Sequence, residues 1–121
     1  MLKQLQRFLF KRKYIKVLWQ QIWENEIEIA HQAKGIADVE AEKIRHQKRA
    51  DVMQGDFDQL NASHKREDRE QAKVLAKDLT DQKQLVGKHE MSAATLRKNI
   101  ESKKTSNEYL LGKIKFVKAN F

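Results

Sequence analysis

Lys88 is the residue of this sequence that most resembles a nucleotide-binding lysine, because it directly follows a glycine. A phosphate-binding loop also needs a glycine five positions before the Gly-Lys pair and Ser or Thr after the lysine. Gln82 and His89 occupy those two places. The sequence therefore predicts no phosphate-binding loop.

The other residue types that carry chemistry are also spaced unsuitably. The four histidines lack partners at the helical spacing of metal ligands, and cysteine is absent, which excludes a thiol nucleophile and a thiolate metal site. The histidines are His31, His46, His64 and His89. Carboxylates are numerous, but an expected rod surface offers no dry site that would shift their pKa values for acid–base catalysis. We predict that the protein is not an enzyme and has no catalytic residue, cofactor or bound metal.

The composition is typical of long helices with a narrow apolar face. Of the 121 residues, 40% are hydrophobic and 35% charged, and proline is absent. A compact globular core needs more apolar residues than this, whereas coiled coils have such a composition.

Two runs of heptad spacing extend over most of the chain. In the first run, 11 of 15 seam positions are apolar, against about six expected from the composition. Its two series are Phe8, Ile15, Ile22, Ile29, Ile36, Lys43, Ala50, Phe57 and Leu18, Asn25, Gln32, Val39, His46, Met53, Leu60. The second run is one residue out of phase and again has 11 apolar positions of 15. Its series are Ala72, Leu79, Val86, Ala93, Ile100, Asn107, Ile114, Phe121 and Leu75, Gln82, His89, Leu96, Lys103, Leu110, Val117. Such spacing predicts an all-α coiled coil.

A polar stretch at 61–71 separates the two runs. We predict a single domain, 1–121, in which two long helices, at about 2–60 and 72–120, form an antiparallel coiled-coil hairpin. One continuous helix that pairs with a second chain is the alternative, and a monomeric hairpin is favoured over such a parallel dimer. Gly55 is a weaker stop signal that would place the bend earlier.

The hairpin is favoured because one antiparallel register places polar seam residues opposite each other. When the numbers of opposed residues add to 132, Asn25 faces Asn107 and Lys43 faces His89. Shifting the register by one heptad would place each asparagine against an apolar residue. We expect these four residues to set the register.

The positive charge is concentrated near the two termini. Residues 1–23 contain six Lys or Arg and residues 109–121 three Lys, and neither segment contains an acid. All aromatic residues except Phe57 lie in the same two segments, which a hairpin brings to one end. Basic and aromatic side chains together are typical of binding surfaces, so we predict that this end binds a protein with an acidic surface. The predicted contact residues are Arg7, Phe10, Lys11, Arg12, Lys13, Tyr14, Lys16, Trp23, Lys113, Lys115, Phe116 and Lys118.

The bend is a second candidate contact point, through Lys65, Arg66 and Arg69.

No uncharged stretch near the N-terminus reaches the roughly 20 residues of a membrane span, and no signal-peptide pattern is present. We expect a cytoplasmic protein.

The chain is small, basic and free of cysteine, and we expect it to form a helical hairpin. In these features it resembles the central-stalk proteins of type III secretion and flagellar export ATPases. Its opening segment is similar to the leucine- and basic-rich start of that family and reads Met1-Leu2-Lys3-Gln4-Leu5-Gln6-Arg7-Phe8-Leu9-Phe10-Lys11-Arg12-Lys13. The resemblance implies a role in protein transport, in which the paired termini enter the pore of a hexameric ATPase and couple it to the export gate. Under it, the residues that meet acids of the ring are Lys11, Arg12, Lys13, Lys113, Lys115 and Lys118. The bend near Arg66 would face the gate.

Three alternatives remain open. A structural or scaffolding coiled coil, of a phage or another large assembly, has the same composition. The basic end could instead bind nucleic acid, with Tyr14 or Trp23 stacking on bases. Finally, residues 2–23 resemble a basic amphipathic helix for a membrane surface. Its apolar side would carry Leu5, Phe8, Leu9, Trp19 and Trp23. That alternative would require the helix to leave the seam.

Overall fold

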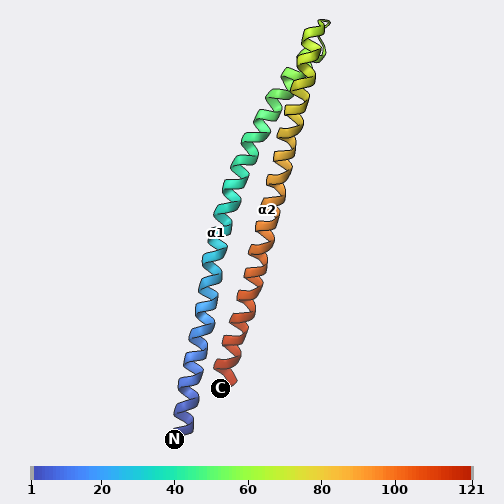
Figure 1. The fold of residues 1–121 in the computed structure, drawn as a ribbon. Coiled ribbons are helices and arrows are strands. Elements are labelled where there is room, and N and C mark those ends of the chain that lie inside the picture. Colours follow the sequence, from blue (N-terminus) through green and yellow to red (C-terminus); the bar gives the residue numbers. More distant parts are fainter. Residues whose placement is uncertain (1, 121) are drawn as a thin grey trace. The chain divides into compact units, whose positions relative to one another are not determined.

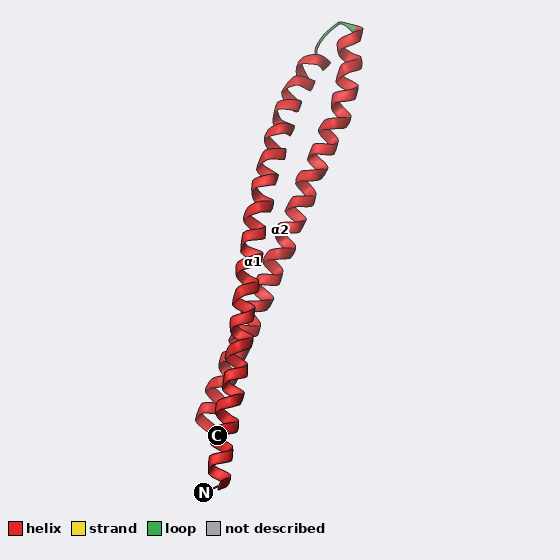
Figure 2. Cartoon of the chain, turned by 60° about the vertical axis from the view of Figure 1, so that its left-hand side comes forward, coloured by secondary structure: helices red, strands yellow, loops and turns green. Residues whose placement is uncertain are grey.

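The computed structural model describes residues 2–120, which form an all-α hairpin of two long helices. Helix α1 spans Leu2–Asn61 and helix α2 spans Arg66–Asn120, and a short loop between them reverses the chain (Figure 2). The predicted all-α hairpin is confirmed. Gly55 lies inside α1, so an earlier bend is wrong. No helix within 2–120 is long and apolar enough to cross a bilayer.

The bend is shorter than the predicted stretch of 61–71, because α2 begins at Arg66 instead of residue 72. The Ser63 hydroxyl donates to Asp68 Oδ2 at 2.7 Å and accepts from the Lys65 backbone amide at 3.2 Å. Glu67 and Asp68 stand in the first turn of α2, where negative charge is favourable. These contacts stabilise a helix start inside a segment whose composition alone suggests a loop.

The hairpin consists of two compact units, which we call the terminal unit and the bend unit. The terminal unit contains residues 1–34 and 96–121, of which 2–34 and 96–120 are described. The bend unit contains residues 35–95. In Figure 1 the terminal unit includes both chain ends, and the bend unit includes the loop. In each unit a length of α1 packs against a length of α2.

The buried apolar side chains of the described residues all occupy predicted seam positions. In the terminal unit, Leu18, Ile22, Leu110 and Ile114 form one cluster, against which Tyr14 and Ile15 pack. Val117 is also buried there. The buried residues of the bend unit are smaller: Ala50, Ala72, Leu79, Val86 and Ala93. The heptad spacing therefore identified the core of both units.

Phe8 departs from the predicted seam, because 59% of its surface is exposed. Phe8 lines a shallow hollow together with Lys118 of α2 and is not covered there. The other predicted terminal seam residue, Phe121, lies outside the described residues.

The polar seam residues of the terminal unit pair across the two helices. Asn25 Nδ2 donates to Asn107 Oδ1 at 2.8 Å, and Asn107 is buried. Lys103 lies on the seam, and its amine pairs with Glu28 at 2.8 Å near the surface. The predicted opposition of Asn25 and Asn107 is confirmed.

The polar layer of the bend unit differs from the predicted pairing of Lys43 with His89. Lys43 Nζ instead pairs with Glu90 Oε1 at 3.1 Å. The His89 ring stacks on His46, with ring centroids 5.3 Å apart, and His46 Nδ1 lies 2.8 Å from Gln82 Oε1. The long Lys43 side chain reaches the carboxylate of Glu90 near the surface, and His89 packs on His46.

Candidate binding surfaces of the terminal unit

The two units differ strongly in charge. The terminal unit contains fourteen Lys and Arg against five acids, a net charge of +9, whereas the bend unit contains eleven against twelve, a net charge of −1. Charge of one sign on one unit creates a local potential that attracts an acidic partner. The candidate sites therefore lie on the terminal unit.

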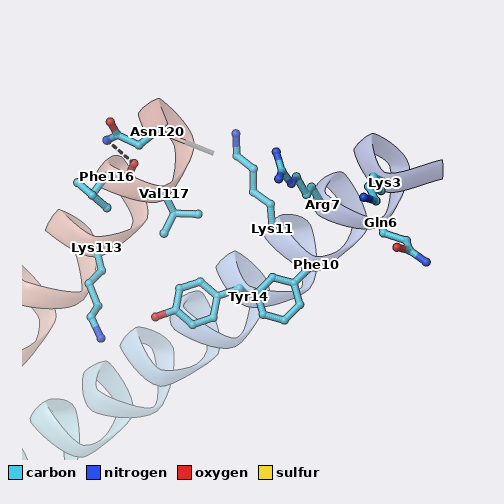
Figure 3. A pocket seen from close by; sticks show the side chains of 10 residues that line it. All are labelled: Lys3, Gln6, Arg7, Phe10, Lys11, Tyr14, Lys113, Phe116, Val117 and Asn120. Atoms are coloured by element: carbon cyan, nitrogen blue, oxygen red, sulfur yellow. Dashed lines mark hydrogen bonds between the residues drawn. The ribbon is translucent and has the colours of Figure 1, made fainter. Parts of the chain in front are cut away.

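One flank of the terminal unit holds an open groove of about 1040 Å³, which we call the terminal groove (Figure 3). Both helices line it, with Lys3, Gln6, Arg7, Phe10, Lys11, Tyr14, Lys113, Phe116, Val117 and Asn120. Four of these residues are cations and none is an acid. The groove thus combines apolar surface with positive charge.

Aromatic rings form much of the groove wall. The rings of Phe10 and Tyr14 stack with centroids 6.4 Å apart and planes 4° from parallel. Phe116 is largely exposed on the opposite helix. Such rings supply contact area at low entropic cost, because an aromatic side chain has few rotatable bonds.

Lys113 is held between tyrosines. Its ammonium lies 5.1 Å from the centre of the Tyr109 ring, a cation–π distance. The pKa of Lys113 is raised above its usual value of 10.5, mainly by interaction with the Tyr109 hydroxyl and to a smaller extent by interaction with Tyr14. Lys113, like a lysine of ordinary pKa, is positively charged near neutral pH.

Two hydrogen bonds satisfy backbone carbonyls at the end of α2. Lys11 Nζ donates to the carbonyl of Lys118 at 3.1 Å, and Asn120 Nδ2 donates to the carbonyl of Phe116 at 2.9 Å. The last carbonyls of a helix lack partners within the helix, and a cation near them also opposes the helix dipole. Lys11 thus ties α1 to the end of α2 beside the groove.

The structure divides the twelve predicted contact residues into two groups. Six line the terminal groove: Arg7, Phe10, Lys11, Tyr14, Lys113 and Phe116. The other six do not line it: Arg12, Lys13, Lys16, Trp23, Lys115 and Lys118. The terminal groove therefore contains only half of the predicted contact residues, because charge and aromatic content were grouped by segment and not by helix face.

The sequence analysis missed four groove residues: Lys3, Gln6, Val117 and Asn120. A signal for Lys3 was present, because Lys3, Arg7, Phe10 and Tyr14 follow one another at steps of four, three and four, which place residues on one helix face. Asn120 and Lys113 are likewise seven residues apart. The spacing used for the seam would have identified this flank too.

At the bend, Lys65, Arg66 and Arg69 are exposed. Three acids alternate with them, and Arg66 Nε lies 3.4 Å from Glu70 Oε1. The three cations thus form no patch of a single charge. A contact at the bend stays a prediction.

Comparison of the chain with protein-family models, with curated proteins and with solved structures gave no match in any of the three. Within residues 2–120, no three His, Cys, Asp or Glu side chains gather where they could hold a metal ion. The chain is a helical hairpin whose terminal groove is basic and aromatic.

Proposed function

We propose that this chain is a non-enzymatic coiled-coil adaptor of the cytoplasm that binds an acidic protein surface in its terminal groove. The observation that carries the proposal is the composition of the groove: four cations, three aromatic rings and no acid, on two helices held together by a packed seam. Aromatic and basic residues are the ones that dominate the binding energy of protein interfaces.

The groove chemistry defines the partner. The stacked pair Phe10 and Tyr14 would cover apolar side chains, while the surrounding cations would attract Asp and Glu and fix the orientation. A segment with apolar residues flanked by acids fits both requirements. Nucleic acid fits less well, because the net positive charge is limited to the terminal unit and does not continue along the bend unit, as contact with a long phosphate backbone would require.

The particular assembly that we propose is the export apparatus of a type III secretion system, with the chain as central stalk of its ATPase. The similarity of residues 1–13 to that family supports this role, as does a hairpin whose net positive charge is confined to the unit with both termini. In this role the terminal unit would insert into the ATPase ring and the bend would face the export gate. The hairpin would act as a monomer.

The first test uses the purified hexameric export ATPase of the same organism and the full chain. Replacing Arg7, Lys11 and Lys113 together with Glu should weaken binding by about a hundredfold or more, since each reversal removes an attraction and adds a repulsion. The matched control reverses Lys65, Arg66 and Arg69, which changes the net charge equally in the bend unit. Calorimetry gives the affinities, and circular dichroism verifies that the helices persist. Wild-type chain that does not bind the ATPase would exclude the stalk role.

The general proposal needs a test that does not depend on the ATPase. A photocrosslinking amino acid in place of Phe116 reports on the groove, and one in place of Val74, which is similarly exposed in the bend unit, serves as control. In cells, the probe at Phe116 should crosslink to an acidic protein, and the probe at Val74 should not. The crosslink from Phe116 should be lost when Arg7, Lys11 and Lys113 are also replaced with Glu. Capture of nucleic acid or lipid alone from the groove would contradict a protein-binding role.

A further inference from the structure

A second exposed surface lies on α1, on the flank away from the terminal groove. Its residues follow one another at alternating steps of three and four, which keeps them on one face of a helix in a coiled coil. They are Leu2, Leu5, Leu9, Arg12, Lys16, Trp19 and Trp23, which we call the tryptophan stripe. None of them lines the terminal groove. The stripe is therefore a separate surface.

The tryptophan stripe is exposed while the seam of the same helix is packed. Its five apolar side chains are between 46% and 73% exposed, whereas Leu18 and Ile22, which alternate with them in sequence, are buried against α2. A membrane-binding face at residues 2–23 therefore does not require α1 to leave the seam.

The neighbouring face of α2 continues the same chemistry. Lys118 shares a small hollow with Arg12, and the heptad spacing places Leu111 on the same flank as Lys118, with Lys115 beside them. The first acids appear at Glu24 on α1 and Glu108 on α2, where the stripe ends. A continuous cationic and apolar surface of roughly 30 Å thus follows residues 2–23.

We propose that the tryptophan stripe binds the surface of a bilayer that contains anionic lipids. Tryptophans favour the interface between headgroups and acyl chains, and leucines enter the outer acyl region. Arg12 and Lys16, between the two apolar groups of the stripe, extend their charged ends to lipid phosphates. The terminal unit would then lie along the membrane with residues 2–23 of α1 against the lipid.

Other occupants fit this surface less well. A second copy of the chain would bring its own cations against those of the first, with no acid in residues 1–23 or 109–121 to neutralise them. A folded protein usually anchors its contact in a pocket, and the apolar side chains of the stripe project from the helix instead of lining the terminal groove. A charged lipid surface is deformable and needs no pocket.

The intrinsic fluorescence of the chain tests the proposal directly, because its only two tryptophans, Trp19 and Trp23, both lie in the stripe. Vesicles that mix phosphatidylglycerol with phosphatidylcholine should shift the emission to shorter wavelength. Lipids brominated near the headgroup should quench it. Vesicles of phosphatidylcholine alone should cause much weaker binding, since the cations of the stripe would find no net negative charge.

Variants separate this surface from the terminal groove. Trp23→Gln and Lys16→Glu should each lower the vesicle partition coefficient by about tenfold. Phe10→Gln is the matched control, an equally exposed ring on the same helix but on the groove flank, and should leave partition within about twofold. For variants that lose tryptophan signal, sedimentation with vesicles gives the partition.

The outcomes distinguish this proposal from the proposed function. Lipid binding that needs Trp23 and Lys16 but not Phe10 supports the stripe, whatever the groove binds. Absence of an emission shift with anionic vesicles overturns it, as does an equal loss of partition in Phe10→Gln. An emission shift caused only by an oligonucleotide, by the ATPase or by self-association in light scattering would assign the stripe to that partner and also overturn the proposal.

Discussion

The terminal unit and the bend unit follow one heptad pattern but fill it with different residues. The seam of the terminal unit buries the branched side chains Leu18, Ile22, Leu110 and Ile114 as one cluster. Three of the five buried apolar residues in the bend unit are alanines, and stacked imidazoles occupy a further layer. Burying an alanine removes much less apolar surface than burying an isoleucine. The terminal unit thus has the stronger apolar seam.

The surfaces of the two units differ in the opposite sense. The terminal unit exposes Leu5, Phe10, Trp23 and Phe116 and has a net charge of +9, while the bend unit is nearly neutral. Exposed aromatic side chains promote association, and repulsion between like charges destabilises the compact state. Burial of the branched side chains in the seam opposes that destabilisation. The terminal unit therefore combines the candidate binding surfaces with the more apolar of the two seams.

The largest effect should come from the seam of the terminal unit. Ile114→Ala is expected to lower the free energy of unfolding by about 2–4 kcal/mol, because it removes buried carbons and leaves a cavity beside Leu18. Urea denaturation followed by tryptophan fluorescence reports on this unit, which contains both tryptophans. Circular dichroism follows the helices of both units.

Leu111→Ala, a change at an exposed neighbour in the same unit, serves as control and should cost about 0.5 kcal/mol or less. If the units unfold separately, Ile114→Ala shifts the fluorescence transition more than the dichroism transition. Equal shifts of both would show that the hairpin unfolds as one cooperative body, and the contrast between the seams would then not extend to stability.

The alanine seam should respond to added volume. Ala93 is buried on the bend unit, and Ala93→Leu is expected to cost about 1–3 kcal/mol, because a larger side chain must force the helices apart. The exposed neighbour provides the control, since Ala94→Leu should change stability by about 0.5 kcal/mol at most. Stabilisation by Ala93→Leu would reveal unfilled space in this seam.

Much of the fold was predictable because a coiled coil repeats one simple rule. The heptad spacing identified every buried apolar residue of the described chain, from Leu18 to Val117, and the opposition of Asn25 and Asn107. It failed where other interactions intervene. Ser63 and Asp68 start α2 inside a polar stretch, and Lys43 turns to Glu90.

The candidate site was only partly predictable, for a different reason. Net charge and aromatic content located the unit that contains the terminal groove, but they contain no directional information. Phe10 and Trp23 were assigned to one surface, and they lie on opposite flanks of α1, as their heptad positions indicate. The identity of the partner depends on a complementary surface that the chain itself does not contain.

The smallest expected effect tests whether the asparagine pair sets the register. Asn25→Ile alone should cost about 1 kcal/mol, because it leaves the buried Asn107 amide without its partner in a seam that is partly open to water. Replacing both asparagines with Ile should restore or increase stability, since two apolar groups then pack together. The double variant should nevertheless populate more than one register, because the register shifted by one heptad would no longer bury an unpaired amide.

Cysteine trapping separates register from stability, because the chain has no cysteine of its own. Cysteines in place of Ile22 and Leu110, which belong to one buried cluster, report the native register. Cysteines in place of Ile22 and Lys103 report the register shifted by one heptad. The double Asn→Ile variant should form both disulfides, and the wild-type seam only the first. If the double substitution leaves the pattern of disulfides unchanged, the apolar cluster of the terminal unit sets the register by itself, and the asparagine pair does not contribute to it.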